Sequence, residues 1–162
     1  EMKKQLNDIE EEIVDMIDVT RETCHELRPP FLEQVGLREA LAELIRRFHL
    51  RSNIKVEWNI HVPTKLDEER ELAVYRMIQE LLNNALKHSQ ASHIQLTLEV
   101  QNEEVQLHYI DNGIGIDIEK LNHYDGKLGL FGIKERVQGL GGTCEMTSQL
   151  GEGLDIRITI PL

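Results

Sequence analysis

The fold is decided by residues 75–88, which read YRMIQELLNNALKH. On a helix, at about 100° per residue, the apolar side chains of this segment fall on one side and the polar ones on the other. The apolar side is typical of a face that packs on a core and consists of Ile78, Leu81, Leu82 and Ala85, together with Val74 directly before the segment. The polar stripe consists of Glu80, Asn83, Asn84 and Lys87.

The chemistry of this polar stripe favours a metal–phosphate site. Its amide and carboxylate oxygens suit Mg²⁺, its lysine suits phosphate, and its carboxylate can orient a hydroxyl group or a water molecule. The alternative is a solvated helix face that carries a chance pair of asparagines. Segments farther along the chain decide between the two.

Three glycine-rich segments follow the helix. Residues 111–116 read DNGIGI directly after an alternating apolar run, residues 126–133 read GKLGLFGI, and residues 151–153 read GEG. Each segment alone is weak evidence, because Asp-Asn-Gly also makes ordinary turns and glycines also make flexible connections. Their order behind a Glu-x-x-x-Asn helix is a much more specific signature.

This ordered set resembles the ATP-binding domain shared by sensor histidine kinases, gyrase, Hsp90 and MutL. Residues 75–80, 84–88 and 139–142 are similar, more narrowly, to histidine kinases of the NarL-partner class, with the competence quorum-sensing kinases of Bacilli as the candidate subgroup. The resemblance covers nearly the whole chain. It implies ATP as the substrate, Mg²⁺ as the cofactor and an ATP-dependent protein histidine kinase as the activity.

The resemblance also implies roles for single residues. Glu80 matches the carboxylate that orients a nucleophile, and Asn84 matches the Mg²⁺ ligand, to which Glu80 could add a contact through water. Asp111 matches the aspartate that accepts a hydrogen bond from the adenine amino group. The other nucleotide contacts that it implies are Asn83, Lys87, His88, Gly113, Gly115, Ile116, Lys127, Gly129, Leu130 and Gly132.

The glycines at positions 126, 129 and 132 resemble a lid loop. Exposed backbone amides and the positive end of the helix that follows would suit phosphate there. The chain departs from the family pattern at Leu154, which follows Gly153 where many relatives carry threonine. This departure puts a polar contact from that position in doubt.

Length and charge limit the alternatives. The 162 residues are enough for one domain and a short extra element, and the formal net charge of −11 argues against nucleic acid or an anionic membrane as the partner. Cys24 and Cys144 show no metal-binding spacing, so we expect free thiols in a reducing compartment, the cytoplasm. The chain opens within a helix, so we expect a fragment of something longer. The kinase resemblance implies that the full-length protein is membrane-anchored.

An N-terminal helix is predicted from apolar or small residues spaced alternately four and three apart, which is a heptad seam. The seam positions are Met2, Leu6, Ile9, Ile13, Met16, Thr20, Thr23 and Leu27. The resemblance implies that residues 1–30 are the second helix of a dimerisation and phosphotransfer hairpin, and that residues 31–162 are the ATP-binding domain. It further implies a homodimer and a NarL-type response regulator as the partner.

His25 lies near the end of this helix, in a segment similar to the phosphate-accepting box of the commoner histidine kinases. The spacing argues against that role, because only one helix and a short connection separate His25 from Glu80. Residues 27–29, Leu-Arg-Pro, instead match the segment that closes the second hairpin helix in the NarL-partner class. We therefore expect the accepting histidine outside this chain.

The remaining patterns predict an α+β domain. Alternation predicts strands at residues 54–60, 93–100, 104–111, 143–148 and 154–160. Helical periodicity predicts helices at residues 36–50, 67–87 and 128–140. We expect a two-layer sandwich, a mixed sheet of about five strands with helices on one face, preceded by the long bundle or coiled-coil helix.

Two classes of function fit these observations. The first is a kinase catalytic domain that donates the γ-phosphoryl group of Mg-ATP to a histidine, for relay to a response regulator. The second is an anti-sigma-factor-type serine kinase, or an ATP-driven dimerisation switch of the same fold. The heptad helix and the Leu-Arg-Pro closure favour the first class.

Overall fold

The computed structural model describes residues 13, 16, 20, 29–118 and 129–162, and it divides the chain into compact units of residues 1–34 and 35–162. In the first unit, the three described seam positions are helical and exposed, and the Thr20 hydroxyl donates a hydrogen bond to the Met16 carbonyl at 2.7 Å. The other seam positions, His25 and Cys24 lie outside the described residues. The assignment of residues 1–30 to a phosphotransfer hairpin stays a prediction.

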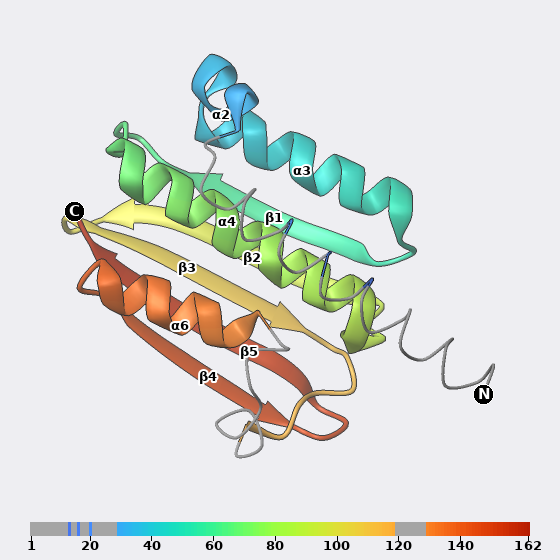
Figure 1. Cartoon of the computed structure of the whole chain (residues 1–162). Helices are drawn as coiled ribbons and strands as arrows, with labels where there is room; N and C mark the ends of the chain where they lie inside the picture. Colours follow the sequence, from blue (N-terminus) through green and yellow to red (C-terminus); the bar gives the residue numbers. More distant parts are fainter. Residues whose placement is uncertain (1–12, 14–15, 17–19, 21–28, 119–128) are drawn as a thin grey trace. The chain divides into compact units, whose positions relative to one another are not determined.

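Five strands form one mixed sheet (Figure 1). They are β1 (Lys55–His61), β2 (His93–Gln101), β3 (Glu104–Asp111), β4 (Thr143–Gln149) and β5 (Gly153–Pro161), in the order β1-β2-β3-β5-β4. β1 pairs with β2 in parallel, and the other pairs are antiparallel. Asn102 and Glu103 both have positive φ and make the two-residue turn between β2 and β3. The expected mixed sheet is confirmed.

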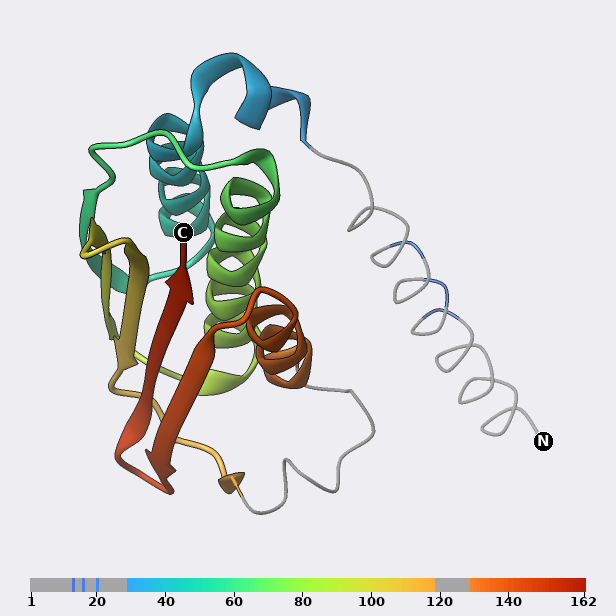
Figure 2. The same ribbon diagram turned by 90° about the vertical axis from the view of Figure 1, so that its left-hand side faces the viewer.

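Three helices of the second unit cover one face of this sheet (Figures 1 and 2). They are α3 (Leu37–Arg51), α4 (Glu68–Asn84) and α6 (Leu130–Gly139). Every second residue of β2 and β3 is buried, and the buried set lies on the helix-covered face. This alternation confirms the two-layer α+β class, and it places Tyr109 and Asp111, at the end of β3, under the helices.

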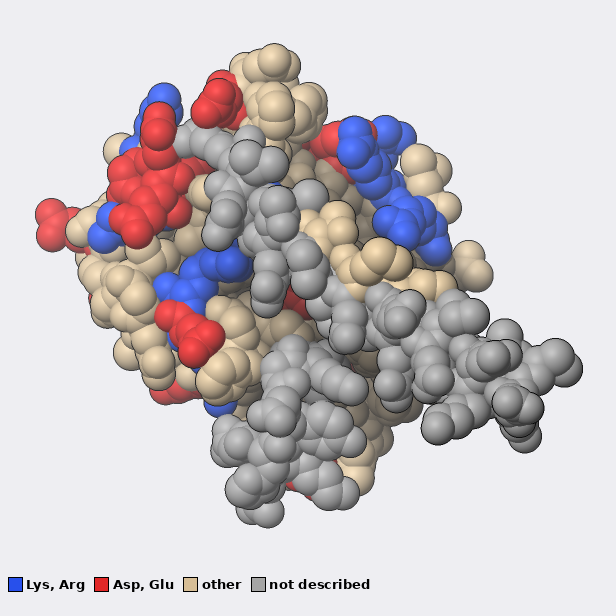
Figure 3. Space-filling model, in the orientation of Figure 1, with Lys and Arg blue, Asp and Glu red and all other residues tan. Residues whose placement is uncertain are grey.

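α4 begins at a well-formed N-cap. The Asp67 carboxylate accepts a hydrogen bond from the Arg70 backbone N–H at 2.9 Å and lies 2.6 Å from the Arg70 guanidinium. The backbone hydrogen bond lowers the pKa of Asp67. Acidic side chains gather over this end of the helix (Figure 3), where the first turn holds Glu68, Glu69 and Glu71 and the positive end of the helix dipole favours them.

Two elements differ from the prediction. α2 (Pro30–Val35) is a short helix directly after the Leu-Arg-Pro segment, where no helix was predicted. It can form there because proline is tolerated in the first turn of a new helix. α4 passes directly into a π-helical turn, η1 (Ala85–Ser89), which ends at Gln90 with a φ of 51°. Helical periodicity predicted an unbroken helix here, because the apolar positions do not show the wider turn. Among the described helices, none has the length and apolar character needed to cross a membrane.

Candidate functional site

A pocket lies where the end of α4, η1, the end of β3, the start of α6 and β5 meet. It holds about 390 Å³ of empty space, part of it open to solvent. Its lining residues are Leu81, Asn84, Ala85, His88, Ser89, Tyr109, Asp111, Gly115, Ile116, Leu130 and Leu154. The wall is mostly apolar, with a few polar groups that could orient a ligand.

Asp111 is the buried charge of the pocket and is 4% exposed. Its Oδ1 accepts a hydrogen bond from the Gly113 N–H at 2.9 Å, and its Oδ2 accepts one from the Tyr109 hydroxyl at 2.7 Å. Buried carboxylates need such partners. An ionised carboxylate has about four lone-pair sites, so Asp111 can accept further hydrogen bonds from a ligand.

The loop after β3 forms the rim of the pocket and is fixed at both sides. The Ile114 N–H donates to the Ser89 carbonyl at 2.7 Å, and the Ile114 carbonyl accepts from the Gly151 N–H at 2.6 Å. The Ile116 N–H donates to Ser148 Oγ at 2.8 Å. The rim therefore bridges η1 and the turn between β4 and β5.

Close approach of the backbone explains the two glycines of this rim. A β-carbon at Gly113 would clash with the Ser89 carbonyl, and one at Gly115, where φ is +71°, would clash with the Gln149 carbonyl. Both clashes are with the chain itself, and Gly115 also lies on the pocket wall. The glycines are thus needed to bring the rim against its supports.

The Nδ2 atom of Asn84 is buried, yet it has no hydrogen-bond partner. A buried polar group without a partner costs roughly 1–3 kcal/mol, which a ligand contact at this wall would relieve. The described residues contain no group of three or more His, Cys, Asp or Glu side chains that could hold a metal. Mg²⁺ still fits, because it commonly takes one or two protein ligands and completes its shell with phosphate oxygens and water.

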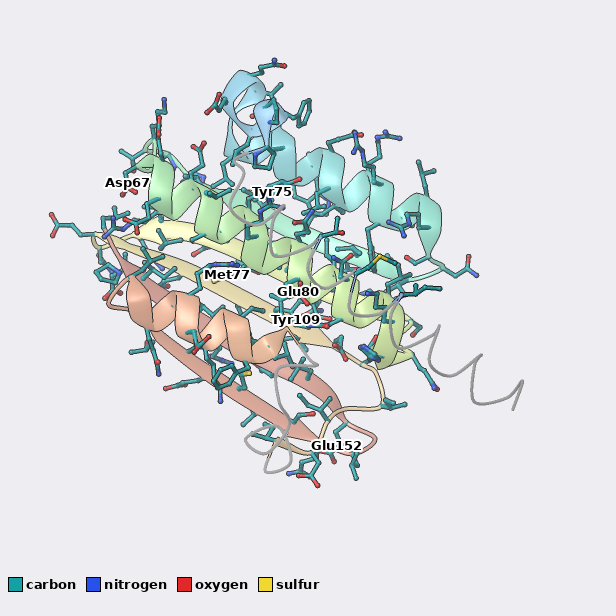
Figure 4. The ribbon with its side chains drawn as sticks, viewed as in Figure 1. Asp67, Tyr75, Met77, Glu80, Tyr109 and Glu152 are labelled. Atoms are coloured by element: carbon teal, nitrogen blue, oxygen red, sulfur yellow. The ribbon has the colours of Figure 1, made fainter. Side chains whose placement is uncertain are left out.

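Glu80 lies one helical turn before Asn84, at the contact between α4 and α6 (labelled in Figure 4). A β-carbon at Gly129 would clash with the Glu80 side chain, so this carboxylate packs directly on the backbone that opens α6. Burial and then the charge of Arg76 lower the pKa of Arg136, and the charge of Glu80 opposes this effect. Two guanidinium groups therefore lie close enough to interact near Glu80.

The start of α6 offers backbone donors at the pocket. Leu130 lines the pocket, and the first hydrogen bond of the helix runs from the Ile133 N–H to the Gly129 carbonyl at 3.1 Å. The N–H groups of residues 130–132 consequently have no acceptor within the helix. Together with the positive end of the helix dipole, these donors suit an anion.

The structure brings part of the predicted set to the pocket wall. The predicted residues on the wall are Asn84, His88, Asp111, Gly115, Ile116 and Leu130. Those that do not line it are Glu80, Asn83, Lys87, Gly113, Gly129 and Gly132. Gly126 and Lys127 lie outside the described residues, so their part in a lid stays a prediction.

Three further residues of the site were missed from the sequence. Tyr109 was counted only as an apolar residue of an alternating strand, although its position two residues before Asp111 put both on one face. Ser89 reaches the rim through the π-turn, which periodicity does not show. Arg136 depends on the packing of α6 against α4, for which the sequence holds no local signal.

Comparison with known proteins identifies a family. Residues 69–162, more than half of the chain, match the family described as histidine kinase-, DNA gyrase B-, and HSP90-like ATPase. Sensor histidine kinase ComP of Bacillus subtilis (strain 168) is 39% identical over 168 residues, which cover 100% of this chain and 21% of that protein. Sensor histidine kinase LiaS of the same organism is 35% identical over 136 residues, which cover 84% of this chain and 37% of that protein. The chain thus spans less than half the length of these relatives.

Solved structures agree with this assignment. The blue-light activated histidine kinase of Erythrobacter litoralis EL346 matches 75% of this chain and 40% of its own, at 26% identity and a TM-score of 0.62. The histidine kinase AdeS of Acinetobacter baumannii matches 99% of this chain and 83% of its own with a TM-score of 0.66, and at 21% identity it supports the fold alone. The chain therefore belongs to the histidine kinase-, DNA gyrase B- and HSP90-like ATPase family, as an ATP-binding domain of the sensor histidine kinase type.

Proposed function

We propose that this chain is the catalytic part of a two-component sensor kinase, which binds Mg-ATP in the pocket and donates the γ-phosphoryl group to a histidine. The observation that carries the proposal is the convergence of three groups on one pocket: the carboxylate of Asp111, the side-chain amide of Asn84 and the open start of α6. An acceptor for the base, an amide oxygen for the metal and backbone donors for phosphate are the parts that a magnesium nucleotide needs.

Each part of the nucleotide has a group in this chain to hold it. Asp111 accepts a hydrogen bond from the adenine amino group, and the apolar wall that includes Leu130 and Leu154 covers the base. The free N–H groups at the start of α6 receive phosphate oxygens, with Lys87 and Lys127 as additional cations. Asn84 is the residue that would hold Mg²⁺, which neutralises phosphate charge when bound.

Glu80 acts on the accepting histidine rather than on the nucleotide. Its carboxylate accepts a hydrogen bond from one imidazole N–H, so that the other ring nitrogen keeps its lone pair for attack on phosphorus. Packing against Gly129 fixes this carboxylate, and Arg76 and Arg136 place positive charge nearby. Catalysis is then mainly positioning and charge neutralisation.

The partners follow from the same assignment. The heptad seam of residues 1–30 supports a dimerisation and phosphotransfer hairpin in a homodimer, and residues 75–80 and 139–142 support a NarL-type response regulator. The proposed setting is the cytoplasmic side of a membrane-anchored kinase, where ATP is available. A role in quorum sensing rests on the resemblance of these motifs alone. The net charge of −11 is unfavourable for nucleic acid as a partner.

Transfer from γ-labelled ATP tests the proposal. The chain is incubated with Mg-ATP and with the separately purified phosphotransfer hairpin of the full-length kinase, and the label is then exposed to acid. We expect acid-labile label on the hairpin, none on this chain, and its loss with Glu80→Gln. Acid-stable label would contradict transfer to histidine and support the serine-kinase class. Acid-labile label on this chain that disappears in His25→Gln would refute the placement of the acceptor elsewhere.

A further inference from the structure

The phenol hydroxyl of Tyr109 lies beside the Asp111 carboxylate in the pocket. Its side chain is 1% exposed, and its hydroxyl donates the 2.7 Å hydrogen bond to Oδ2 of Asp111. Both side chains line the pocket, and both point to the helix-covered face from β3. Figure 4 labels Tyr109 on this strand. The Tyr109 hydroxyl and the Asp111 carboxylate therefore form one hydrogen-bonded pair at the pocket.

The proton of this phenol is committed to the carboxylate. A phenol donates one hydrogen bond and accepts with its lone pairs. Burial, followed by the charge of Asp111 and the hydrogen bond to it, raises the pKa of Tyr109 well above its ordinary value of 10.0. The other carboxylate oxygen is held by the Gly113 N–H. These groups consequently present only acceptor lone pairs to a ligand.

We propose that Tyr109 is a positioning residue that makes the pocket select purines with a 6-amino group over purines with a 6-oxo group. The inference rests on the proposed function and adds to Asp111 a second residue that sets base specificity. A 6-amino group donates an N–H to the acceptors. A 6-oxo group brings a further lone pair against them and has no proton to give at that position.

Immobilisation of the carboxylate is the essential contribution of Tyr109. An Asp111 side chain held at both oxygens cannot rotate away from a 6-oxo group, nor turn to accept the N1–H of a 6-oxopurine. Removal of the phenol hydroxyl frees Oδ2 and permits both adjustments. A Tyr109 that only filled the core would affect all nucleotides equally, so the ratio of two purine affinities separates positioning from packing.

Calorimetric titration of the 162-residue chain with three magnesium nucleotides tests the proposal. They are ADP, IDP and the diphosphate of purine riboside, which has no group at position 6. We expect ADP to bind most tightly and IDP least. Tyr109→Phe should weaken ADP about five- to tenfold and IDP less than twofold, because one oriented hydrogen bond to a charged group is lost. Tyr75→Phe is the matched control, since Tyr75 does not line the pocket and its variant should keep the wild-type ratio.

The outcomes separate this inference from the function on which it rests. A folded Tyr109→Phe variant with an unchanged ratio of ADP to IDP affinity overturns the inference and leaves the proposed function standing. A wild-type chain that binds none of the three nucleotides overturns both. If Tyr109→Phe does not fold, the ratio in Tyr109→Met decides, because that variant lacks the same hydroxyl. IDP binding as tight as that of the unsubstituted purine in the wild-type chain would also refute the proposal.

Discussion

Two substitutions of Asp111 are expected to differ in stability although both remove the charge. In Asp111→Ala, the Gly113 N–H and the Tyr109 hydroxyl lose a common acceptor that is 4% exposed. Each orphaned donor costs roughly 1–3 kcal/mol, and water in the open part of the pocket recovers some of this. We expect the free energy of unfolding to fall by about 2–4 kcal/mol.

Asp111→Asn keeps both hydrogen bonds. The amide oxygen can accept from the Gly113 N–H, and the amide nitrogen can donate to the phenol oxygen of Tyr109, because a phenol also accepts. The charge assistance and the acceptor of the phenol proton are lost, so the free energy of unfolding should fall by about 1–2 kcal/mol. In a chain of this size each kcal/mol lowers Tm by roughly 2–4 °C.

Urea unfolding followed by circular dichroism, with a thermal scan beside it, measures both differences. The account requires Asp111→Ala to be the less stable variant by about 1–2 kcal/mol. Equal stability of the two variants would refute it, because the hydrogen bonds to Asp111 would then contribute nothing. A near-wild-type Asp111→Ala would refute it more strongly.

Substitutions at three further positions test separate parts of the account. Gly129→Ala should displace the Glu80 carboxylate and lower phosphotransfer at least tenfold, while ADP affinity stays within about twofold. Gly139→Ala is the control, because its β-carbon meets open space. Unchanged transfer in Gly129→Ala would contradict the packing role. Asn84→Ala should abolish the dependence of ADP affinity on Mg²⁺, measured by comparing titrations in Mg²⁺ and in EDTA. It should lose little stability, because the amide nitrogen of Asn84 has no partner. A Mg²⁺ effect of wild-type size in this variant would rule out the metal contact. Asp67→Ala should cost about 1 kcal/mol at neutral pH and Asp67→Asn less. The folded pKa of Asp67 lies below its ordinary value of 3.8, so its charge-dependent stability is present above that pH and is lost as the pH falls below it. Urea unfolding at pH 6 and pH 3 should therefore show the wild type converging on Asp67→Asn. A constant difference between the two proteins would exclude the linkage.

The fold could be predicted because its signals are local and repeat. Local patterns indicate which side chains face the core. They are the apolar stripe of α4 and the alternation of buried residues in β2 and β3. The structure then places a two-residue turn, Asn102 and Glu103, between the strands predicted at 93–100 and 104–111. Ordered motifs carry Asn84 and Asp111, and the structure places both residues on the wall of one pocket.

The parts that were missed depend on contacts between distant segments. The hydroxyl of Tyr109 matters only because helices bury it beside Asp111. Arg136 matters only because α6 packs against α4, and the π-turn that delivers Ser89 leaves the pattern of apolar residues unchanged. Hydrophobic periodicity records which residues are buried, and it does not record which buried polar atoms meet.

Direct calorimetric titration with Mg-ADP tests the central claim, that this pocket binds an adenine nucleotide through Asp111. The wild-type chain should bind one Mg-ADP with a saturable heat. Folded Asp111→Asn should bind at least tenfold more weakly, because its amide N–H faces the adenine amino group where an acceptor is required. Absence of binding in the wild-type chain, or equal affinity of the two proteins at a temperature where both are folded, would contradict the account.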